Sequence, residues 1–478
     1  MQIIHQAPLA ALGLGAAFTV IWGVADPVAA FAEVRVIEAD GYYIMGDGPE
    51  ENAAVAKERA RADARRAASE QAGLYVASIT EVKKGKLTRD EVRMISACVL
   101  QVQEDKVTPE VMGGSVIQYH CHMRAVVDTG NITDQLQQDS QKFAEAVQRN
   151  KELEADLVRV NAELAELKER YQTAPEAERQ EINRETKLNE DKFMAVQWNK
   201  KGMERYNRKD YKGAIECFRK AIEIDPSYAR PWNNMGSAYE SLGNYNKAIE
   251  YFRKAIELDP KYAMPWNNMG SACDSLGDHN KAIEYYRKAI ELDPKDAYPW
   301  NNMGDAYDDL GNYSRAIECY RKAIELNSGY ADPWNNMGYA YRKLKDYGKA
   351  IECYRKAIEI NPGYTDPWNN MGYSYRKLED YNKAIECYRK ALEIDQRDAT
   401  PWNGMGYAYK KLGDYNRAIE CYQKAIELAP REAVYRYNLG LTYERLKQYE
   451  KAIECYRKAV ELDPKDSDYK EALNNLLG

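Results

Sequence analysis

Asparagine recurs through the C-terminal half of the chain at a spacing suited to binding a peptide backbone. Six asparagines stand 34 residues, or a multiple of 34, apart, with Gly404 at the one interrupted place. A carboxamide both donates and accepts hydrogen bonds, so a row of them matches the N–H and C=O groups of an extended peptide. The row would also arise if Asn were simply common at this place in a repeat. We predict a peptide-binding row of Asn234, Asn268, Asn302, Asn336, Asn370 and Asn438.

Charged side chains in the same period are segregated by sign. The acids come first along the chain, at Glu240, Asp274, Asp305, Asp308 and Asp309. The bases follow, with tyrosines beside them, at Arg342, Lys343, Arg376, Lys377, Lys410, Lys411, Tyr339, Tyr373 and Tyr407. A solvated face would scatter its signs, although duplication of neighbouring units would also copy charges. The separation predicts a protein or peptide partner with a basic segment against the acids and an acidic segment against the bases.

Most of the nine cysteines are predicted to pack rather than to react. Six occupy the same place in the period, at Cys217, Cys319, Cys353, Cys387, Cys421 and Cys455. Equivalent places on stacked helices lie about 9 Å apart or more, whereas disulfide Cα atoms are rarely more than about 7 Å apart. Cys98 and Cys121 fall on two predicted strands whose register the sequence does not define, so their pairing stays open.

Histidine and the known catalytic motifs give no sign of an enzyme. His120 and His122 share one face of a predicted strand, but without a third ligand they indicate solvated side chains. Cys273 and His279 replace tyrosines of the third unit, which predicts local repacking. The sequence has no phosphate-binding glycine loop, nucleophile elbow or metal-binding helix motif. We therefore expect no catalytic residue, no metal, no cofactor and a non-enzymatic protein.

The elements that position these residues are helical repeats. Seven tryptophans follow one another at intervals of 34 residues from Trp198 to Trp402. With the recurrent Met-Gly, Tyr, Ala, Phe or Tyr, and Pro, the pattern resembles the tetratricopeptide repeat family, whose unit is a helix-turn-helix. We predict a mainly α protein with an α-solenoid of eight repeats, at 195–228, 229–262, 263–296, 297–330, 331–364, 365–398, 399–432 and 433–466.

The resemblance also orients each unit. A single unit leaves an apolar face bare, so the units must stack, and residues 467–478 are predicted to cap the last one. In this family, unit positions 2, 5, 6, 9, 12 and 13 line a concave groove. The position-6 asparagines resemble the asparagine ladder in the repeat domain of O-linked N-acetylglucosamine transferase, which holds an extended peptide. The transferase activity is not implied, because no transferase domain is present.

Residues 136–171 carry a heptad pattern. Side chains that are apolar except at Asn150 recur seven residues apart from Leu136 to Tyr171, although Asp139 interrupts the alternate seam. Such heptads predict a coiled coil, and Asn150 in the seam favours a two-stranded homodimer. A single amphipathic helix packed on the repeats or on the first domain would show the same pattern. We assign 131–194 to the coiled coil and a hinge, where Pro175 breaks the helix.

Residues 33–130 predict a small α+β domain. One helical face of small residues, at Ala53, Ala56, Ala60, Ala64 and Ala67, would let a helix lie flat on a sheet. The expected order is strand, helix, strand, helix, strand, strand, at Glu33–Met45, Pro49–Gly73, Tyr75–Val82, Leu87–Ser96, Cys98–Gln103 and Ser115–Asp128.

Three motifs of this domain point to a family. They are the turn Gly46-Asp47-Gly48, the helical run Asp63-Ala64-Arg65-Arg66-Ala67 and the closing strand Met123-Arg124-Ala125-Val126-Val127. With them the domain resembles the amino-terminal domain of flagellar assembly protein T and related envelope lipoproteins. The resemblance implies an accessory role in the cell envelope and no reaction. An unrelated small α+β domain is the alternative.

Residues 1–32 read as a secretory signal peptide. An apolar run from Ala7 to Val24 is followed by the small-residue site Ala30-Phe31-Ala32, although the first five residues carry no Lys or Arg. An uncleaved membrane anchor or a mis-assigned start are the alternatives. The net charge of −7 argues against nucleic acid as a partner. We expect an exported bacterial protein of the periplasm or cell envelope that acts as a protein-binding scaffold, or else a purely structural dimeric spacer.

Overall fold

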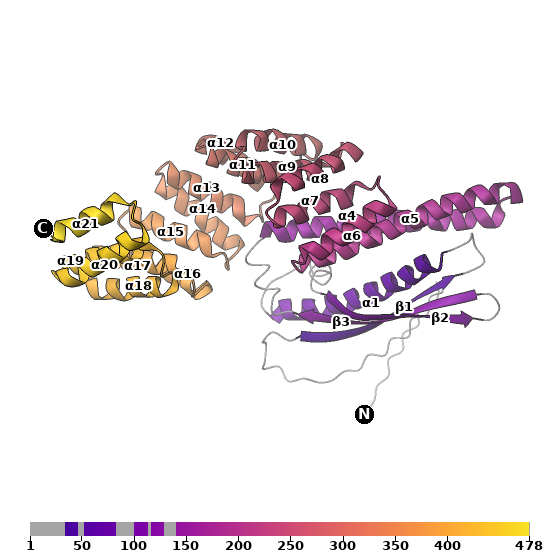
Figure 1. The fold of residues 1–478 in the computed structure, drawn as a ribbon, viewed down its shortest axis with the longest axis horizontal. Helices are drawn as coiled ribbons and strands as arrows, with labels where there is room; N and C mark the ends of the chain where they lie inside the picture. The colour runs from indigo at the N-terminus through magenta and orange to yellow at the C-terminus, as the bar shows by residue number, and fades with distance from the viewer. Residues whose placement is uncertain (1–33, 46–51, 83–99, 113–115, 129–139, 478) are drawn as a thin grey trace, which may run out of the picture.

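The computed structural model describes residues 34–45, 52–82, 100–112, 116–128 and 140–477. A small sheet with its covering helix lies beside a helical hairpin, and an array of paired helices extends from there to the C terminus (Figure 1). The predicted signal peptide, the predicted helix Leu87–Ser96 and Cys98 lie outside these residues. Among the helices within them, none is long and apolar enough to cross a membrane.

The α+β part is an antiparallel sheet with one long helix on its face. Strands β1 (Val34–Met45), β2 (Leu100–Met112) and β3 (Val116–Asp128) lie in the order β1-β3-β2. Helix α1 (Ala53–Val82) packs on them through alanines that are fully buried, at Ala56, Ala60, Ala64, Ala68 and Ala72. A Cβ added at Gly41 of β1 would lie 2.1 Å from the backbone nitrogen of Ala64. Small residues on both sides therefore allow the close approach that the sequence indicated.

Two details of that prediction were wrong. The segment Tyr75–Val82 is not a strand, because α1 continues through it to Val82. The spacing of four residues from Ala60 through Ala72 extends to Val76 and Thr80, so the run fits a helix as well as a strand, and a helix tolerates Gly73. The buried face also follows Ala68 and Ala72, while Ala53 is exposed and Ala67 is only half-buried.

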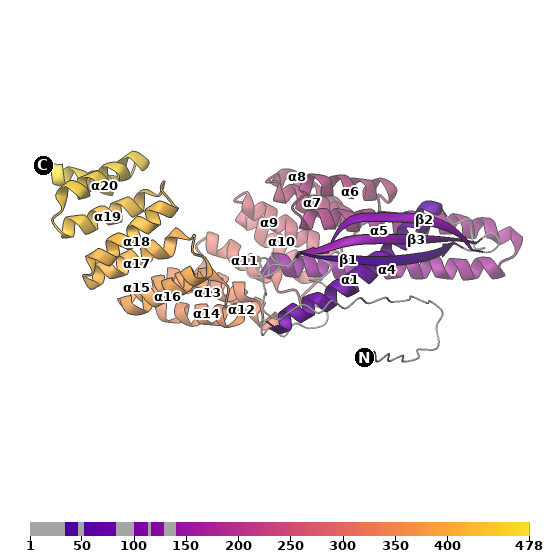
Figure 2. The ribbon, with the colours of Figure 1, turned by 90° about the horizontal axis from the view of Figure 1, so that it is seen from below.

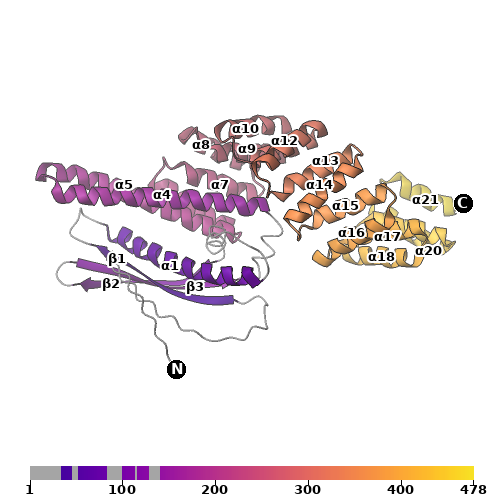
Figure 3. The same ribbon diagram turned by 180° about the vertical axis from the view of Figure 1, so that it is seen from behind.

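Helices α4 (Ser140–Thr173) and α5 (Glu176–Asn207) form a hairpin around Pro175, next to α1 and the first repeats (Figure 3). Val160 and Leu164 of the heptad seam are buried in one cluster with Phe193 of α5 and Val55 of α1. The array also holds α4, because Arg230 donates to Asp156 at 2.8 Å and to Glu152 at 3.2 Å.

From Leu153 to Leu167, the described part of the heptad seam is thus buried within the chain. This is the alternative of an amphipathic helix packed on the repeats and the first domain. A homodimer through 136–171 would require α4 to leave these contacts. The side chain of Asn150, on which the two-stranded prediction rested, lies outside the described part of the structure.

The remainder is the predicted solenoid of eight units, which follows a curved path to the C terminus (Figure 2). The first helix of the first unit is the C-terminal part of α5, and α6 (Tyr211–Ile224) completes that unit. The next six units pair α7 (Ala229–Ser241) with α8 (Tyr245–Leu258), α9 (Ala263–Ser275) with α10 (His279–Leu292), α11 (Tyr298–Asp309) with α12 (Tyr313–Leu326), α13 (Ala331–Lys343) with α14 (Tyr347–Ile360), α15 (Thr365–Lys377) with α16 (Tyr381–Ile394), and α17 (Ala399–Leu412) with α18 (Tyr415–Leu428). The last unit pairs α19 (Ala433–Arg445) with α20 (Tyr449–Leu462), and α21 (Ser467–Leu477) packs its Tyr469 on them.

In each unit the two helices pack against each other through a glycine of the first helix and an aromatic ring of the second. A Cβ added at Gly304 would lie 2.5 Å from the ring of Tyr320, so only glycine allows the second helix to pack this closely. The turn between the two helices has a left-handed residue at unit position 15, which is Gly in four units and Lys or Glu in the other four. An Asp or Asn then caps the second helix in the first seven units, as Asn312 does by accepting from the backbone N–H of Arg315, whereas Gln448 of the eighth unit makes no such bond. The predicted fold class, a mainly α solenoid of eight repeats after a small α+β domain, is confirmed.

Candidate partner-binding groove

The asparagine row is hydrogen-bonded from unit to unit. The side-chain nitrogen at position 6 donates to the side-chain oxygen of the asparagine at position 5 of the preceding unit. The six bonds are Asn234 to Asn199 at 2.9 Å, Asn268 to Asn233 at 3.0 Å, Asn302 to Asn267 at 3.1 Å, Asn336 to Asn301 at 3.4 Å, Asn370 to Asn335 at 3.3 Å, and Asn438 to Asn403 at 3.0 Å. The row therefore cross-links the units.

These bonds occupy amide groups that the sequence analysis assigned to a peptide. Asn234 and Asn268 are only 4% and 5% exposed. Asn336 is half-buried, but its nitrogen also donates to Asp305 at 2.9 Å. Peptide binding by the row stays a prediction, and at Asn336 a peptide carbonyl would have to compete with an existing bond.

At Gly404 an aromatic ring fills the place of the missing side chain. A Cβ at this residue would lie 2.4 Å from the ring of Tyr388, which occupies the space of a position-6 side chain. Asn369, the position-5 residue of the preceding unit, donates to Asp398 at 2.8 Å, but its buried side-chain oxygen has no hydrogen-bond partner among the described residues. The row thus consists of two pieces, one before and one after this joint.

The basic residues form an alternating stack with the tyrosines. The guanidinium of Arg342 lies 4.5 Å from the ring centre of Tyr339 and 4.6 Å from that of Tyr373. The guanidinium of Arg376 likewise lies 4.8 Å from Tyr373 and 4.2 Å from Tyr407. Each arginine is held by cation–π contact with two rings, which leaves the N–H groups at its edge to donate.

Lys410, at the end of this stack, is surrounded by other positive charges. Burial, reinforced by the charges of Lys411, Arg445 and Arg376, lowers the pKa of Lys410 to about 8. In the described structure the Nε atoms of Arg342 and Arg376 are buried and have no hydrogen-bond partner. We call Arg342, Lys343, Arg376, Lys377, Lys410 and Lys411 the basic segment. A bound anion would both pair its donors and restore the charge of Lys410.

The acidic side chains lie close together, and the pKa values of Asp305 and Asp308 are raised, which favours their neutral forms. Burial raises the pKa of Asp305 to about 7 although Tyr320 donates to it at 2.7 Å, and the neighbouring carboxylates Asp274, Asp308 and Asp309 add to the rise. Burial and Asp309 likewise raise the pKa of Asp308 to about 6. We call Glu240, Asp274, Asp305, Asp308 and Asp309 the acidic segment. A cation placed beside them would stabilise their charged forms.

The cysteines and histidines behave largely as expected. Burial raises the pKa of Cys319, Cys353, Cys387 and Cys421 to about 12, so these thiols are packed and unreactive. His120 and His122 do share a face, and both contact one carboxylate oxygen of Asp40, at 2.8 and 2.9 Å. The sequence analysis missed Asp40, which only the pairing of β1 with β3 brings to this place.

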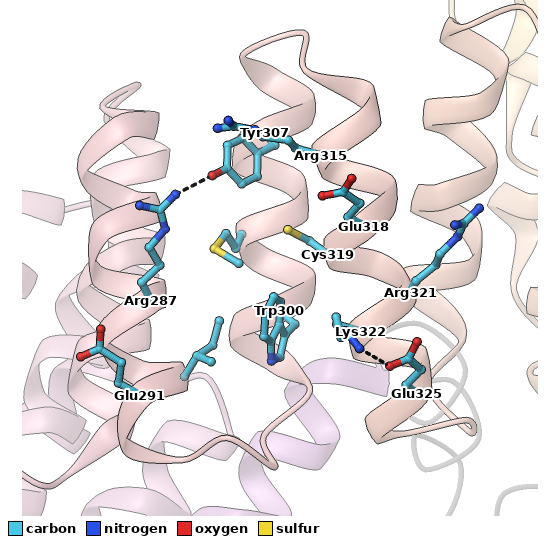
Figure 4. A pocket seen from close by; sticks show the side chains of 12 residues that line it. Arg287, Glu291, Trp300, Tyr307, Arg315, Glu318, Cys319, Arg321, Lys322 and Glu325 are labelled. Carbon is cyan, nitrogen blue, oxygen red and sulfur yellow. Dashed lines mark hydrogen bonds and ion pairs between the residues drawn. The ribbon is translucent and has the colours of Figure 1, made fainter.

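A second hollow lies on the other side of the helices, away from the groove positions. A depression of about 750 Å³ is lined by α10, α11 and α12, with Trp300 at its base and Arg287 donating to Tyr307 at 2.8 Å (Figure 4). An equivalent depression of about 630 Å³ surrounds Trp368 two units further on. It therefore repeats with the array and belongs to the packing of the units.

Comparison with protein families agrees with this geometry. Models described as tetratricopeptide repeat match residues 229–262, 263–296, 285–318, 331–364, 353–386 and 397–465, and a model described as TPR repeat matches 202–243, 304–345 and 372–413. Together they span 202–465, more than half of the chain, without a gap. The chain belongs to the tetratricopeptide repeat family. Arrays of this family are protein-binding scaffolds and are generally not catalytic.

Among solved structures, a chain of the APC/C hetero-tetramer Cut9-Hcn1 aligns with a TM-score of 0.45 and 18% identity over 64% of this chain. The alignment spans 64% of that chain, slightly less than two thirds. YrrB, a TPR protein with an unusual peptide-binding site, aligns with a TM-score of 0.34 and 27% identity over 40% of this chain and 99% of its own. MamA aligns with a TM-score of 0.31 and 29% identity, over 33% of this chain and 93% of its own. A comparison with curated proteins finds no match.

Proposed function

We propose that the protein is a scaffold that holds an extended segment of a partner protein along the groove of its repeat array. A basic part of the partner lies against the acidic segment, and an acidic part lies against the basic segment. The observation that carries the proposal is the stack of Arg342 and Arg376 between three tyrosine rings, because it holds two guanidiniums in fixed positions.

The state of the charges supports this assignment. Lys410 has its pKa lowered and Asp305 and Asp308 have theirs raised, chiefly by burial, so each is less charged here than in water. A partner of opposite sign would reverse these shifts and gain binding energy from doing so. Because the two segments lie in successive units, they also fix the direction in which the partner binds.

The asparagine row contributes mainly by fixing the spacing of the units. A preset groove binds more tightly than a flexible one, because less conformational freedom is lost on binding. Backbone contacts from the half-buried Asn302, Asn336, Asn370 and Asn438 remain part of the proposal, as additions to this role. We also propose that the scaffold acts in the cell envelope of a bacterium, on the basis of the signal-like residues 1–32 and of the resemblance of 33–130.

The test is reversal of the basic segment in the full chain. The triple variant Arg342→Glu, Arg376→Glu and Lys410→Glu replaces three donors with acceptors. Partners captured from a bacterial envelope fraction are compared by quantitative mass spectrometry, and the affinity of the leading one is then measured. Repulsion of several kcal/mol predicts that its Kd rises by about a hundredfold or more. Binding to the unchanged protein should weaken as salt is raised.

The matched control makes the same change of net charge elsewhere. Lys322, Lys356 and Lys390 are exposed on the second helices of their units, where each pairs with a nearby glutamate. Reversing these three to Glu should leave capture unchanged. If the groove variant keeps its circular dichroism spectrum and still binds like the unchanged protein, the proposal is wrong. If the unchanged protein captures nothing, the structural spacer is the better account.

A further inference from the structure

The third unit departs from the others where its two helices meet. Position 17, the first residue of the second helix, is His279 here and Tyr in each of the other seven units. Position 11 is Cys273, whereas the other six of the seven units that follow the first have Tyr there. The sequence analysis expected repacking at both positions. Cys273 is buried as expected, whereas His279 is half-buried and contacts acidic side chains of two units.

Three helices bring one imidazole and two carboxylates together. The Nδ1 atom of His279, at the start of α10, lies 2.7 Å from an oxygen of Asp274 near the end of α9. It lies 4.0 Å from an oxygen of Asp309 at the end of α11, in the next unit. One potential ligand atom from each of the three side chains lies within 4.8 Å of the other two.

The surroundings favour a cation at this point. Asp274 is half-buried, and its carboxylate lies against His279. Among the ion pairs of the described residues, Asp274 and Asp309 are both paired with His279. Asp308 lies beside them, with one buried oxygen that has no hydrogen-bond partner in the described structure. Two carboxylates thus share one imidazole, with further negative charge nearby.

We propose that His279, Asp274 and Asp309 bind a divalent transition-metal ion of the zinc type. Imidazole nitrogen and carboxylate oxygen bind Zn²⁺ at about 2.0–2.2 Å, so tetrahedral ligand atoms are roughly 3.4 Å apart. The distance of 2.7 Å between His279 and Asp274 has to lengthen, and the distance of 4.0 Å between His279 and Asp309 has to shorten. Each change is less than 1 Å, which side-chain rotation achieves. The imidazole favours such a metal over Ca²⁺ or Mg²⁺, which prefer oxygen alone.

The site would have an open coordination position. Asp309 is exposed, with 58% of its side-chain surface accessible, so the metal would face solvent beside it. The fourth ligand is therefore water or a side chain of a bound protein. Metal binding here does not depend on the proposed groove partner, because all three protein ligands belong to this chain. The metal would link the third and fourth units of the solenoid, since its ligands come from α9, α10 and α11.

The test uses Co²⁺ as a spectroscopic probe on the full chain. Because His120 and His122 converge on Asp40, both are first replaced by Ala to remove the second His–carboxylate cluster of the described residues. We expect one equivalent of Co²⁺ to bind, with the visible absorption of a nitrogen and oxygen ligand set and no thiolate charge-transfer band. Zn²⁺ should displace it.

Two variants taken from the chain's own repeats are the controls. His279→Tyr restores the residue of the other seven units, and Asp309→Ser installs the residue found at position 13 of the second and third units. Both should fold normally by circular dichroism. We expect the first to abolish the Co²⁺ spectrum and the second to weaken binding by at least about tenfold. The proposal is overturned if the starting protein binds no Co²⁺ at millimolar concentration, or if His279→Tyr binds it equally well.

Discussion

Asp305 offers a quantitative test of the electrostatics of the acidic segment. Its carboxylate accepts from Asn301 at 3.1 Å, Asn336 at 2.9 Å and Tyr320 at 2.7 Å, and its pKa is raised from 3.8 to about 7, with burial the largest cause. We predict that Asp305→Asn changes the free energy of unfolding relative to the unchanged protein, and that this change is more favourable to the folded variant at about pH 8 than at about pH 5.

The sign follows from the direction of the shift. An acid whose pKa is higher in the folded state stabilises the fold only while it is protonated. Its cost therefore grows as the pH rises from the unfolded value toward the folded one, and is complete above about pH 7. Asparagine has no charge to bury, so the stability of the variant lacks this pH dependence.

The size of the effect follows from the same shift. A difference of about three pKa units corresponds to a change of about 2.5 kcal/mol between pH 5 and pH 8. Asp305 is half-buried and solvent screens part of its charge, so we expect about 1–2 kcal/mol. Urea unfolding followed by circular dichroism at the two pH values measures the difference.

The matched control is Glu325→Gln, which removes an exposed carboxylate that pairs with Lys322 at 2.6 Å on the opposite side of the unit. Surface pairs of this kind contribute about 0–1 kcal/mol, so the control should behave alike at both pH values. A stability difference between Asp305→Asn and the unchanged protein that does not vary with pH would refute the reasoning.

Three further predictions concern stability and assembly. Lys345→Gly should stabilise the array by up to about 1 kcal/mol, because Lys345 has a left-handed φ of 64°. Gly311→Ala at the same unit position should destabilise the array by about as much. The unfolding midpoints of the two variants check both expectations. Phe193→Ala should cost about 3–5 kcal/mol and loosen the α4–α5 hairpin, measured as faster amide exchange in α4. Because Val160 and Leu164 of the heptad seam are buried against α5 and α1, light scattering at tens of micromolar should show no dimer formed through 136–171; a dimer that dissociates on Leu164→Glu would contradict this.

The repeat array was predictable because its information is local and repeated. Trp, Gly and Tyr return at the same unit positions, and each unit needs only its neighbours to bury its apolar face. The close contact of Gly304 with Tyr320 follows from the same pattern. The non-repeated part was less predictable, since Tyr75–Val82 satisfies two periodicities and only its continuity with α1 decides between them.

For the candidate site, the sequence predicts which residues share a position of the repeat but not how they are bonded. That the charged and aromatic residues bind a partner stays a prediction, and the structure adds how they pair with one another. The partner of each position-6 asparagine is the position-5 residue of another unit, a contact that no pattern within one unit contains. Asp40, which joins His120 to His122, is likewise 80 residues from the first of them in sequence.

The break in the asparagine row at Gly404 has a mechanical consequence. Up to Asn370, every pair of successive units is joined by a hydrogen bond between two asparagine side chains, so the first six units should bend together as one elastic body. Between the sixth and seventh units this fastening is replaced by the ring of Tyr388 against a glycine. Apolar contact resists sliding less than a directed hydrogen bond does. A pull on the two ends of the array should therefore open this joint first, and the last two units can change their angle to the rest while the register of the groove before them is kept.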